Sequence, residues 1–525
     1  MVVHLNLSTI PIQVQYGEVL EVSHSERECV IKHDEFFKKA NSLKQDFEAR
    51  ETFFTNRTSA LFPIYFQGPH NDLILSWLNY WTIKNNIDAD AIAVNLRVYD
   101  ETGDLVLRET LGLCSENNSI SVSGFLKRDV FSGMAEIEII STSNIRYTFP
   151  AVSAFYKSGS FYSCVHPAGR IKGSDEIHNV VKTEETNWTC KFGEDVTPFF
   201  HYVNGGSDQS VSLTINLYAE NGEVAESVNV LEHLKPFGSK IYFIDELFNS
   251  KILREKMFVG VMCSNDSVFR RMVVGNYHKK IQHLEVTHSF QKQENYDFCP
   301  ENEGAYQSYF SIPTDKNLSL TCRVFPTNCS NDFKVTESTL PFVKDVLSEP
   351  SDTNKLDEGY GKISLDDSVR MSVLWLSGSK VPSRLSINFL YKVKGVDSVF
   401  STDIAAGALS SVYPPKYNHW GSGILGNGYD FALMIRNVTH RLDATNAEGC
   451  LRIFGLGKIY EFDVACAGQA STSIVLSELL KNSDLKDSTE EKIFTWFLSL
   501  DKPNSETSWV SFRQSDGCVV GEHGF

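Results

Sequence analysis

Residues 257–290 read MFVGVMCSNDSVFRRMVVGNYHKKIQHLEVTHSF. The stretch holds an apolar segment, a polar turn, a second apolar segment, and a third that ends on His288. Residues 135–169, AEIEIISTSNIRYTFPAVSAFYKSGSFYSCVHPAG, follow the same order and reach His166. The interval is 31 residues in each case, from Met257 to His288 and from Ala135 to His166. Self-similarity at a fixed spacing predicts an array of one structural unit.

Two further copies extend the array. Residues 491–525, EKIFTWFLSLDKPNSETSWVSFRQSDGCVVGEHGF, repeat the pattern with 30 residues from Ile493 to His523. Another copy lies between the one that ends at His288 and the C-terminal one. Its hairpin is expected in GKISLDDSVRMSVLWLSG and its closing strand in RLSINFLYK. This alignment places Asn388 where the other copies carry histidine. Three copies are therefore expected to present a histidine at one structural position.

Each copy holds about six or seven short strands with turn signals every 8–12 residues, which is typical of an antiparallel β-sandwich. Apolar and polar residues alternate strictly around Leu213, Ile215 and Leu217, and these three side chains are expected to face a core. A short strand running into one helical turn recurs as SVSGFLKRDVF, KPFGSKIYFIDELF, STLPFVKDVL and TSIVLSELL. We predict an all-β chain of four tandem antiparallel β-sandwich repeats, at residues 61–172, 181–293, 303–392 and 415–525.

The N-terminal segment, residues 1–60, has a different pattern. Apolar residues fall at helical spacing among Lys, Asp and Glu and predict one amphipathic helix with the stripe Phe36, Ala40, Leu43, Phe47 and Phe54. We expect this helix to pack on the first sandwich; the alternative is a helix that drives oligomerisation.

The charge composition limits the classes of partner that the chain is expected to bind. The 525 residues carry a net charge of -17, which disfavours nucleic acid and anionic membrane surfaces, because both are bound by clustered Lys and Arg. The beginning of the sequence lacks the pattern of a signal peptide, and no apolar run approaches the roughly 20 residues that span a bilayer. We expect a cytoplasmic protein, or one assembled into a particle or surface structure, without membrane insertion.

Cysteine usage favours reduced thiols. There are 11 cysteines and no CxxC spacing, and most cysteines lie in apolar strands, where a free thiol behaves as a small hydrophobe. Cys322 and Cys329 flank a predicted turn and are the alternative, a pair that could be bridged in an oxidising compartment.

Turn residues suggest a family. Asn204-Gly205-Gly206-Ser207-Asp208 precedes a strand that ends at Tyr218, and the corners Ser264-Asn265-Asp266-Ser267 and Ser141-Thr142-Ser143-Asn144 begin later strands. This order resembles the β-sandwich superfamily named for the sensory rhodopsin transducer. The resemblance implies an oligomer-prone sandwich that binds small molecules or sugars. The chain departs from the family in having four tandem copies and no proline at the corner.

The repeated histidines His166, His288 and His523 are the first candidate ligand-binding residues. The alternative is that each histidine forms a hydrogen bond to a loop of its own sandwich. No HxH, HExxH or CxxC spacing brings metal ligands together locally, so the sequence predicts no metal site and no cofactor.

Aromatic residues beside polar loops are the second candidates. Trp188, Trp420 and Trp81 stand in EETNWTC, KYNHWGSG and NYWTIK, near predicted junctions between units. Their rings could stack on the C–H faces of a sugar. The alternative is that they fill the interfaces between sandwiches.

No catalytic residue is assigned, because no nucleophile elbow or phosphate loop occurs. The sequence favours a non-enzymatic binding protein, able to form a homo-oligomer, that recognises carbohydrate or another small polar ligand at loops between repeats. One alternative is a structural surface or virion component assembled through repeated sandwich faces. A second alternative is an enzyme that acts on glycans with carboxylates on loops.

Overall fold

The structure is a computed structural model that describes residues 56–524 except for connecting segments, which include 84–91, 142–151, 172–183, 293–305 and 340–353. The predicted N-terminal helix, the side chain of Trp81 and the proposed Cys322–Cys329 pair lie outside the described residues.

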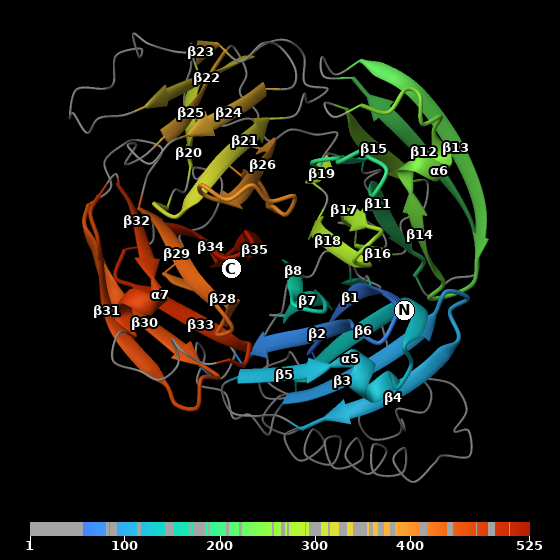
Figure 1. Ribbon diagram of the computed structural model, residues 1–525, viewed down its shortest axis with the longest axis horizontal. Helices are drawn as coiled ribbons and strands as arrows, with labels where there is room; N and C mark the ends of the chain where they lie inside the picture. Colours follow the sequence, from blue (N-terminus) through green and yellow to red (C-terminus); the bar gives the residue numbers. More distant parts are fainter. Residues whose placement is uncertain are drawn as a thin grey trace, which may run out of the picture.

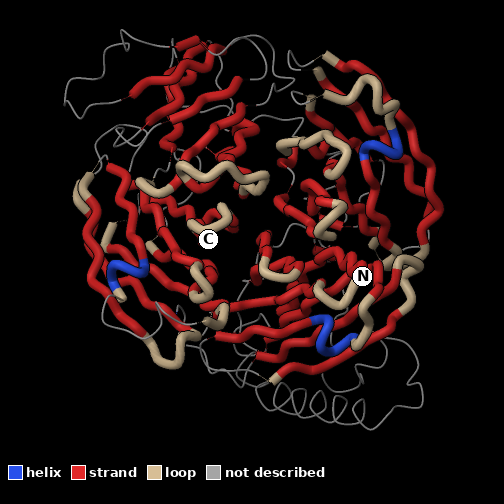
Figure 2. Tube along the Cα trace, in the orientation of Figure 1, coloured by secondary structure: helices blue, strands red, loops and turns tan. Residues whose placement is uncertain are grey.

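The described chain is all-β, as predicted, and its helices are single turns (Figure 2). None of these described helices has the length and apolar character needed to cross a bilayer. The first unit comprises β1 (Asn56–Gln67), β2 (Asn71–Leu78), β3 (Ile92–Asp100), β4 (Leu105–Leu111), β5 (Asn117–Ser121), α5 (Val122–Leu126), β6 (Val130–Ser141), β7 (Val152–Ser158) and β8 (Phe161–Val165).

The second unit comprises β10 (Glu184–Thr186), β11 (Val196–Val203), β12 (Gln209–Tyr218), β13 (Val224–Leu234), β14 (Ser239–Phe243), α6 (Ile244–Leu247), β15 (Phe258–Cys263), β17 (Val273–His278) and β18 (His283–His288), and is extended by β19 (Phe290–Lys292). A two-stranded pair links it to the first unit, with β9 (Arg170–Ile171) next to β16 (Val268–Phe269).

The third unit comprises β20 (Tyr306–Ile312), β21 (Leu318–Val324), β22 (Phe333–Thr339), β23 (Asn354–Lys355), β24 (Gly361–Leu365), β25 (Ser372–Gly378), β26 (Arg384–Val393) and β27 (Thr402–Ala408). The fourth comprises β28 (Asn418–Leu425), β29 (Tyr429–Asn437), β30 (Ala447–Phe454), β31 (Tyr460–Cys466), β32 (Ala470–Val475), α7 (Leu476–Leu479), β33 (Lys492–Leu500), β34 (Ser505–Arg513) and β35 (Cys518–His523).

All four units share one topology. The first, sixth, third and fourth strands of a unit form one antiparallel sheet, in the order β1-β6-β3-β4 in the first unit. The fifth, second, seventh and eighth strands form the other, in the order β5-β2-β7-β8. The same orders recur in the other three units, and β19 adds an edge strand in the second. We call these the outer and the inner sheet, because they lie on the outside and the inside of the molecule (Figure 1).

Each unit whose core side chains are described is a sandwich with the core between its two sheets. In the first unit, Phe62, Leu96 and Ile137 of the outer sheet pack against Leu75 and Trp77 of the inner sheet. These residues alternate along their strands with residues of the opposite face, which is the periodicity that predicted a sandwich. The strand that leads into a helical turn is also confirmed, as β5–α5, β14–α6 and β32–α7.

The four sandwiches form a closed ring around a central axis (Figure 1). The fourth unit packs on the first: Trp420 and Phe497 join the core cluster of the first unit, and Phe155 joins that of the fourth. Glu491 lies at this junction, where it accepts a hydrogen bond from the Tyr162 hydroxyl at 2.6 Å. The array therefore closes on itself.

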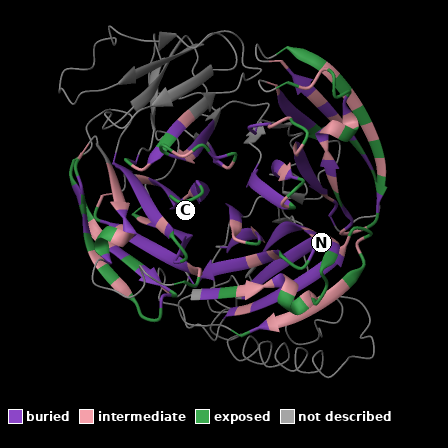
Figure 3. Cartoon of the chain, viewed as in Figure 1, coloured by how far each residue is buried: buried purple, intermediate pink, exposed green. Residues whose placement is uncertain are grey.

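Where burial is described, central strands of the inner sheets such as β11, β17 and β29 are almost fully buried, whereas the outer sheets have exposed edges (Figure 3). Every residue of β18 is buried, while β13, an outer edge strand, alternates between exposed and half-buried positions. Polar side chains on the second face of the inner sheets are consequently buried between units, and the Ser163 hydroxyl donates to the Leu284 carbonyl at 2.5 Å across one such junction.

The strand assignment in the third unit was wrong by one position. RLSINFLYK is the seventh strand, β26, and not the closing strand, so Asn388 is not the counterpart of the histidines. The eighth strand is β27, which pairs with β26 and lies beyond the predicted boundary at residue 392. The stretch GKISLDDSVRMSVLWLSG holds the fifth and sixth strands, β24 and β25, and not the sixth and seventh.

Gly275 provides a test of the packing in the inner sheet. A Cβ at this position would lie 1.9 Å from the Glu285 carbonyl oxygen on β18. We expect Gly275→Ala to separate β17 from β18 and to lower the free energy of unfolding by about 1–3 kcal/mol, measured by urea denaturation. Gly112→Ala is the matched control, since a Cβ there meets nothing within 4 Å; equal stability of the two variants would contradict this account.

His201 predicts a dependence of stability on pH. His201 lies on the same face of β11 as Phe199, which packs against the first unit. Burial lowers the pKa of His201 to about 3. Between pH 6.5 and 3 the unfolded chain therefore binds a proton that the folded chain does not, so stability falls as the pH falls. Between pH 7 and pH 5, His201 alone should lower the free energy of unfolding by about 2 kcal/mol.

The measurement is the urea midpoint at both pH values for the native chain and for His201→Leu. The variant should lose less stability on acidification than the native chain. His70→Leu, at an exposed position, is the matched control for replacing a histidine by leucine. An unaltered dependence in His201→Leu would rule out this origin.

Candidate functional site on the ring axis

The eighth strands of the four units meet at the centre of the ring. β8 contacts β18 and β35, and β27 contacts the same two strands, so that one strand from each unit surrounds the axis (Figure 1). A small pocket near the beginning of these strands is lined by residues of all four units, among them Phe161, Glu285, Ser401 and Cys518. The repeated histidines stand at or just after the other end.

His166, His288 and His523 form one cluster. The Nε2 atoms of His166 and His523 are 3.0 Å apart. The ring centroid of His288 is 4.4 Å from that of His166 and 5.7 Å from that of His523. The structure therefore brings together all three histidines that the repeat pattern singled out, although they come from three different units. The alternative, in which each histidine bonds only within its own sandwich, does not hold for His166 and His523.

Glu522 completes the cluster. One potential ligand atom from each of Glu522 and the three histidines lies within 4.8 Å of the others. The carboxylate is held in place because its Oε1 accepts a hydrogen bond from the backbone N–H of His523 at 2.8 Å. The same oxygen lies 3.8 Å from Nε2 of His523.

The burial of these side chains limits the size of a ligand that the cluster can bind. The exposed fractions are 5% for His166, 3% for His288 and 1% for Glu522, whereas the side chain of His523 is 26% exposed. β27, the fourth strand at the axis, reads TDIAAGA and contributes no imidazole. Only a ligand of one or a few atoms can contact all four side chains, and the His523 side is the accessible one.

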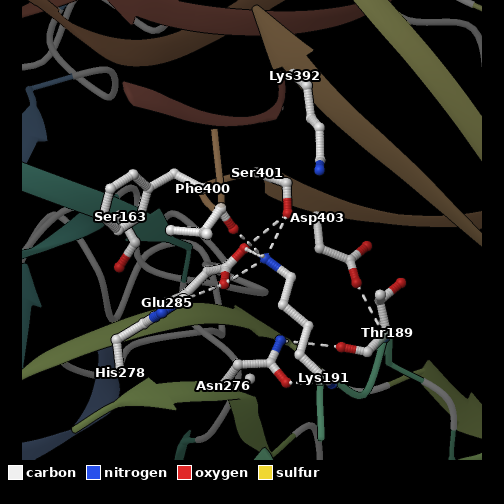
Figure 4. A network of polar contacts seen from close by, with 12 residues as sticks. Ser163, Thr189, Lys191, Asn276, His278, Glu285, Lys392, Phe400, Ser401 and Asp403 are labelled. Atoms are coloured by element: carbon white, nitrogen blue, oxygen red, sulfur yellow. Dashed lines mark hydrogen bonds and ion pairs between the residues drawn. The ribbon is translucent and has the colours of Figure 1, made fainter. Parts of the chain in front are cut away.

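A second polar cluster lies at the junction of the second and third units (Figure 4). The Lys191 ammonium donates to both carboxylate oxygens of Glu285 at 2.7 Å, and the Ser401 hydroxyl donates to Oε1 at 2.9 Å. Nε2 of His278 lies 2.8 Å from the other oxygen. Nearby, Asp403 accepts a hydrogen bond from the Thr189 backbone N–H at 2.9 Å.

The electrostatics of this second cluster favour a structural role. Burial alone would raise the pKa of Glu285, but Lys191 and His278 outweigh it and lower that pKa to about 2. So weak a base does not activate the Ser401 hydroxyl, and the Lys191 ammonium is already engaged by Glu285 and Ser401. We conclude that these residues join the second unit to the third.

The two described tryptophan candidates do not offer a surface for a sugar. Trp188 is 1% exposed, lies in the core of the second unit and donates from Nε1 to the Gly275 carbonyl at 3.1 Å. Trp420 is 5% exposed and packs between the fourth unit and the first. Both rings are covered by protein, and the position of Trp420 agrees with the alternative that these rings fill the interfaces between sandwiches.

Several site residues were not identified from the sequence. Glu522 directly precedes His523, and neighbouring residues of a regular strand point to opposite faces, so the strand pattern gives no signal for a shared site. Lys191, Glu285 and Ser401 are far apart in the chain and carry no motif. The fold of the second unit brings Lys191 to Glu285, and packing of the third unit adds Ser401.

The Lys191–Glu285 pair gives a stability prediction. Lys191→Met should lower the free energy of unfolding by about 3–5 kcal/mol, because it leaves a buried carboxylate without its main partner. The double variant Lys191→Met/Glu285→Gln should recover much of this loss, since no charge is then left buried. Urea denaturation tests both variants, and the exposed pair Lys280–Asp195 provides the control Lys280→Met, which should change little. A double variant no more stable than Lys191→Met would count against the assignment.

The comparisons with known proteins give no family. No family model and no curated protein matches the chain. Among solved structures, it is similar to a calcium binding mutant of Bacteroides uniformis beta-glucuronidase 2, with 9% identity and a TM-score of 0.11, over 49% of this chain and 28% of that one. The chain thus spans little more than a quarter of that protein, and a likeness at this level supports no conclusion about fold or function.

Proposed function

We propose that this chain is a non-enzymatic binding protein, a single-chain ring that holds a small ligand at the axial cluster of His166, His288, His523 and Glu522. The observation that carries the proposal is the convergence of three repeated histidines on one point of the axis. Binding there would use groups from the first, second and fourth units at once.

The size of the ligand follows from burial. Three of the four side chains are almost completely covered, so an extended sugar or peptide would not reach them without opening the ring. An ion or a molecule of a few atoms fits this geometry. Carbohydrate, one of the ligands expected from the sequence, lacks a described exposed indole to stack on, and the proposal therefore does not name it. The resemblance to the sensory rhodopsin transducer superfamily stays a prediction.

Catalysis is not part of the proposal. The buried carboxylates of Glu136 and Glu138 are engaged by Arg97, with contacts of 3.2 and 2.6 Å, on the outer sheet of the first unit. Glu285 is engaged by Lys191 and His278. These carboxylates are paired with cations, which does not favour the acid and base roles that an enzyme acting on glycans would need.

The test is a thermal-shift screen of the full chain with inorganic anions, small sugars, carboxylic acids and divalent cations. At least one ligand should raise the unfolding midpoint of the native chain but not that of His166→Asn/His288→Asn. His70→Asn, exposed and remote from the cluster, is the control and should respond like the native chain. A ligand whose stabilisation persists in the double variant binds elsewhere, and a screen without any axial ligand would contradict the proposal.

A further inference from the structure

We propose that the axial cluster is a metal site that binds one divalent transition-metal ion of the Zn²⁺ class through His166, His288, His523 and Glu522. This inference rests on the proposed function, because it names the ligand of the same site. The repeat pattern identified the three histidines, and the geometry adds Glu522 and brings the four side chains together.

The distances suit a metal ion. Zinc bonds to imidazole nitrogen at about 2.0–2.1 Å, so two nitrogens of a tetrahedral site lie roughly 3.3 Å apart. The Nε2 atoms of His166 and His523 are separated by 3.0 Å, and all four ligand atoms fall within 4.8 Å of one another. Side-chain adjustments of about 1 Å would bring such a set to a common centre.

The outer contacts of His523 orient its ring. Nδ1 of His523 lies 3.3 Å from the Gly524 carbonyl, and a metal-binding histidine commonly donates its second ring N–H to such an oxygen. With Nδ1 protonated, Nε2 presents its lone pair to the cluster. The Gly524 peptide is itself held, because its backbone N–H donates to the Thr507 carbonyl at 2.8 Å. Glycine is required there, since a Cβ would lie 1.8 Å from the Thr507 hydroxyl oxygen.

The donor set decides the class of ion. Three imidazoles and one carboxylate favour Zn²⁺, Co²⁺, Ni²⁺ or Cu²⁺, whereas Ca²⁺ and Mg²⁺ prefer oxygen ligands. Three neutral imidazoles with one carboxylate carry a single negative charge, which a divalent cation offsets. Since Glu522 is 1% exposed, a bound cation would compensate a charge that is otherwise buried.

Coordination would also join separate parts of the chain. His166 and His523 are 357 residues apart in sequence, and His288 comes from a third unit. An ion held by all of them binds the closed ring better than an open one, so it should stabilise ring closure by mass action. The fourth unit contributes both His523 and Glu522, which allows four ligands from three units.

The experiment uses the untagged full chain, stripped with a chelator and then titrated with Co²⁺. We expect one Co²⁺ per chain by elemental analysis, a visible absorption typical of four- or five-coordinate cobalt, its displacement by Zn²⁺, and a higher unfolding midpoint with metal. His288→Asn and Glu522→Gln should weaken binding by about 100-fold or more, because each removes a direct ligand. His70→Asn should bind like the native chain.

The variant Glu522→Gln distinguishes a loss of metal binding from a loss of folding. Its amide oxygen can still accept the hydrogen bond from the His523 backbone N–H, so the metal-free variant should keep the circular dichroism and urea midpoint of the metal-free native chain. Cobalt binding that survives in both ligand variants, or a native chain that takes up no cation at the axis, overturns the metal assignment. If another small ligand then binds in a His166- and His288-dependent manner, the proposed function stands without the metal; if none does, both proposals fall.

Discussion

The ring depends on the burial of both faces of its inner sheets. One face of each closes a sandwich, and the other packs against a neighbouring unit, so the eighth strands come to surround the axis. An antiparallel sheet can leave one face in water, and the outer sheets of this protein do so. The inner sheets cannot leave that face in water, because the first and fourth units also contact each other and close the ring.

This constraint explains the polar residues at the junctions. A group that is removed from water must find a partner within the protein. Ser163 donates to a carbonyl of the second unit, and Lys191 neutralises Glu285 between the second unit and the third. Desolvation offsets much of the attraction within a buried ion pair, so the net gain in stability from Lys191 and Glu285 is smaller than their short contact suggests. These polar contacts also hold each unit at a defined position around the axis.

The axial histidines are a product of the same constraint. Repetition places a histidine at the end of an equivalent strand in three units, and ring closure turns three equivalent positions into one cluster. In the third unit the equivalent strand is β27, which holds alanine and glycine instead. The cluster is therefore asymmetric, and Glu522 supplies a fourth donor from a strand that already contributes His523. The differences among the repeats thus leave three imidazoles and one carboxylate at the axis.

The sequence by itself determined the all-β class, the repeated unit and the three histidines, because alternation and turn signals reflect interactions between residues close in the chain. It also indicated the short helical turns after β5, β14 and β32. It did not fix the order of strands in the third unit, where the seventh strand, β26, was taken for the eighth. Only the tertiary structure decided that Trp188 and Trp420 are covered, that the polar faces of the inner sheets are buried, and that Glu522 joins the histidines. Trp188 is covered within its own unit, whereas the other outcomes depend on contacts between different units. A strand pattern is the same whether its polar face meets water or another sandwich.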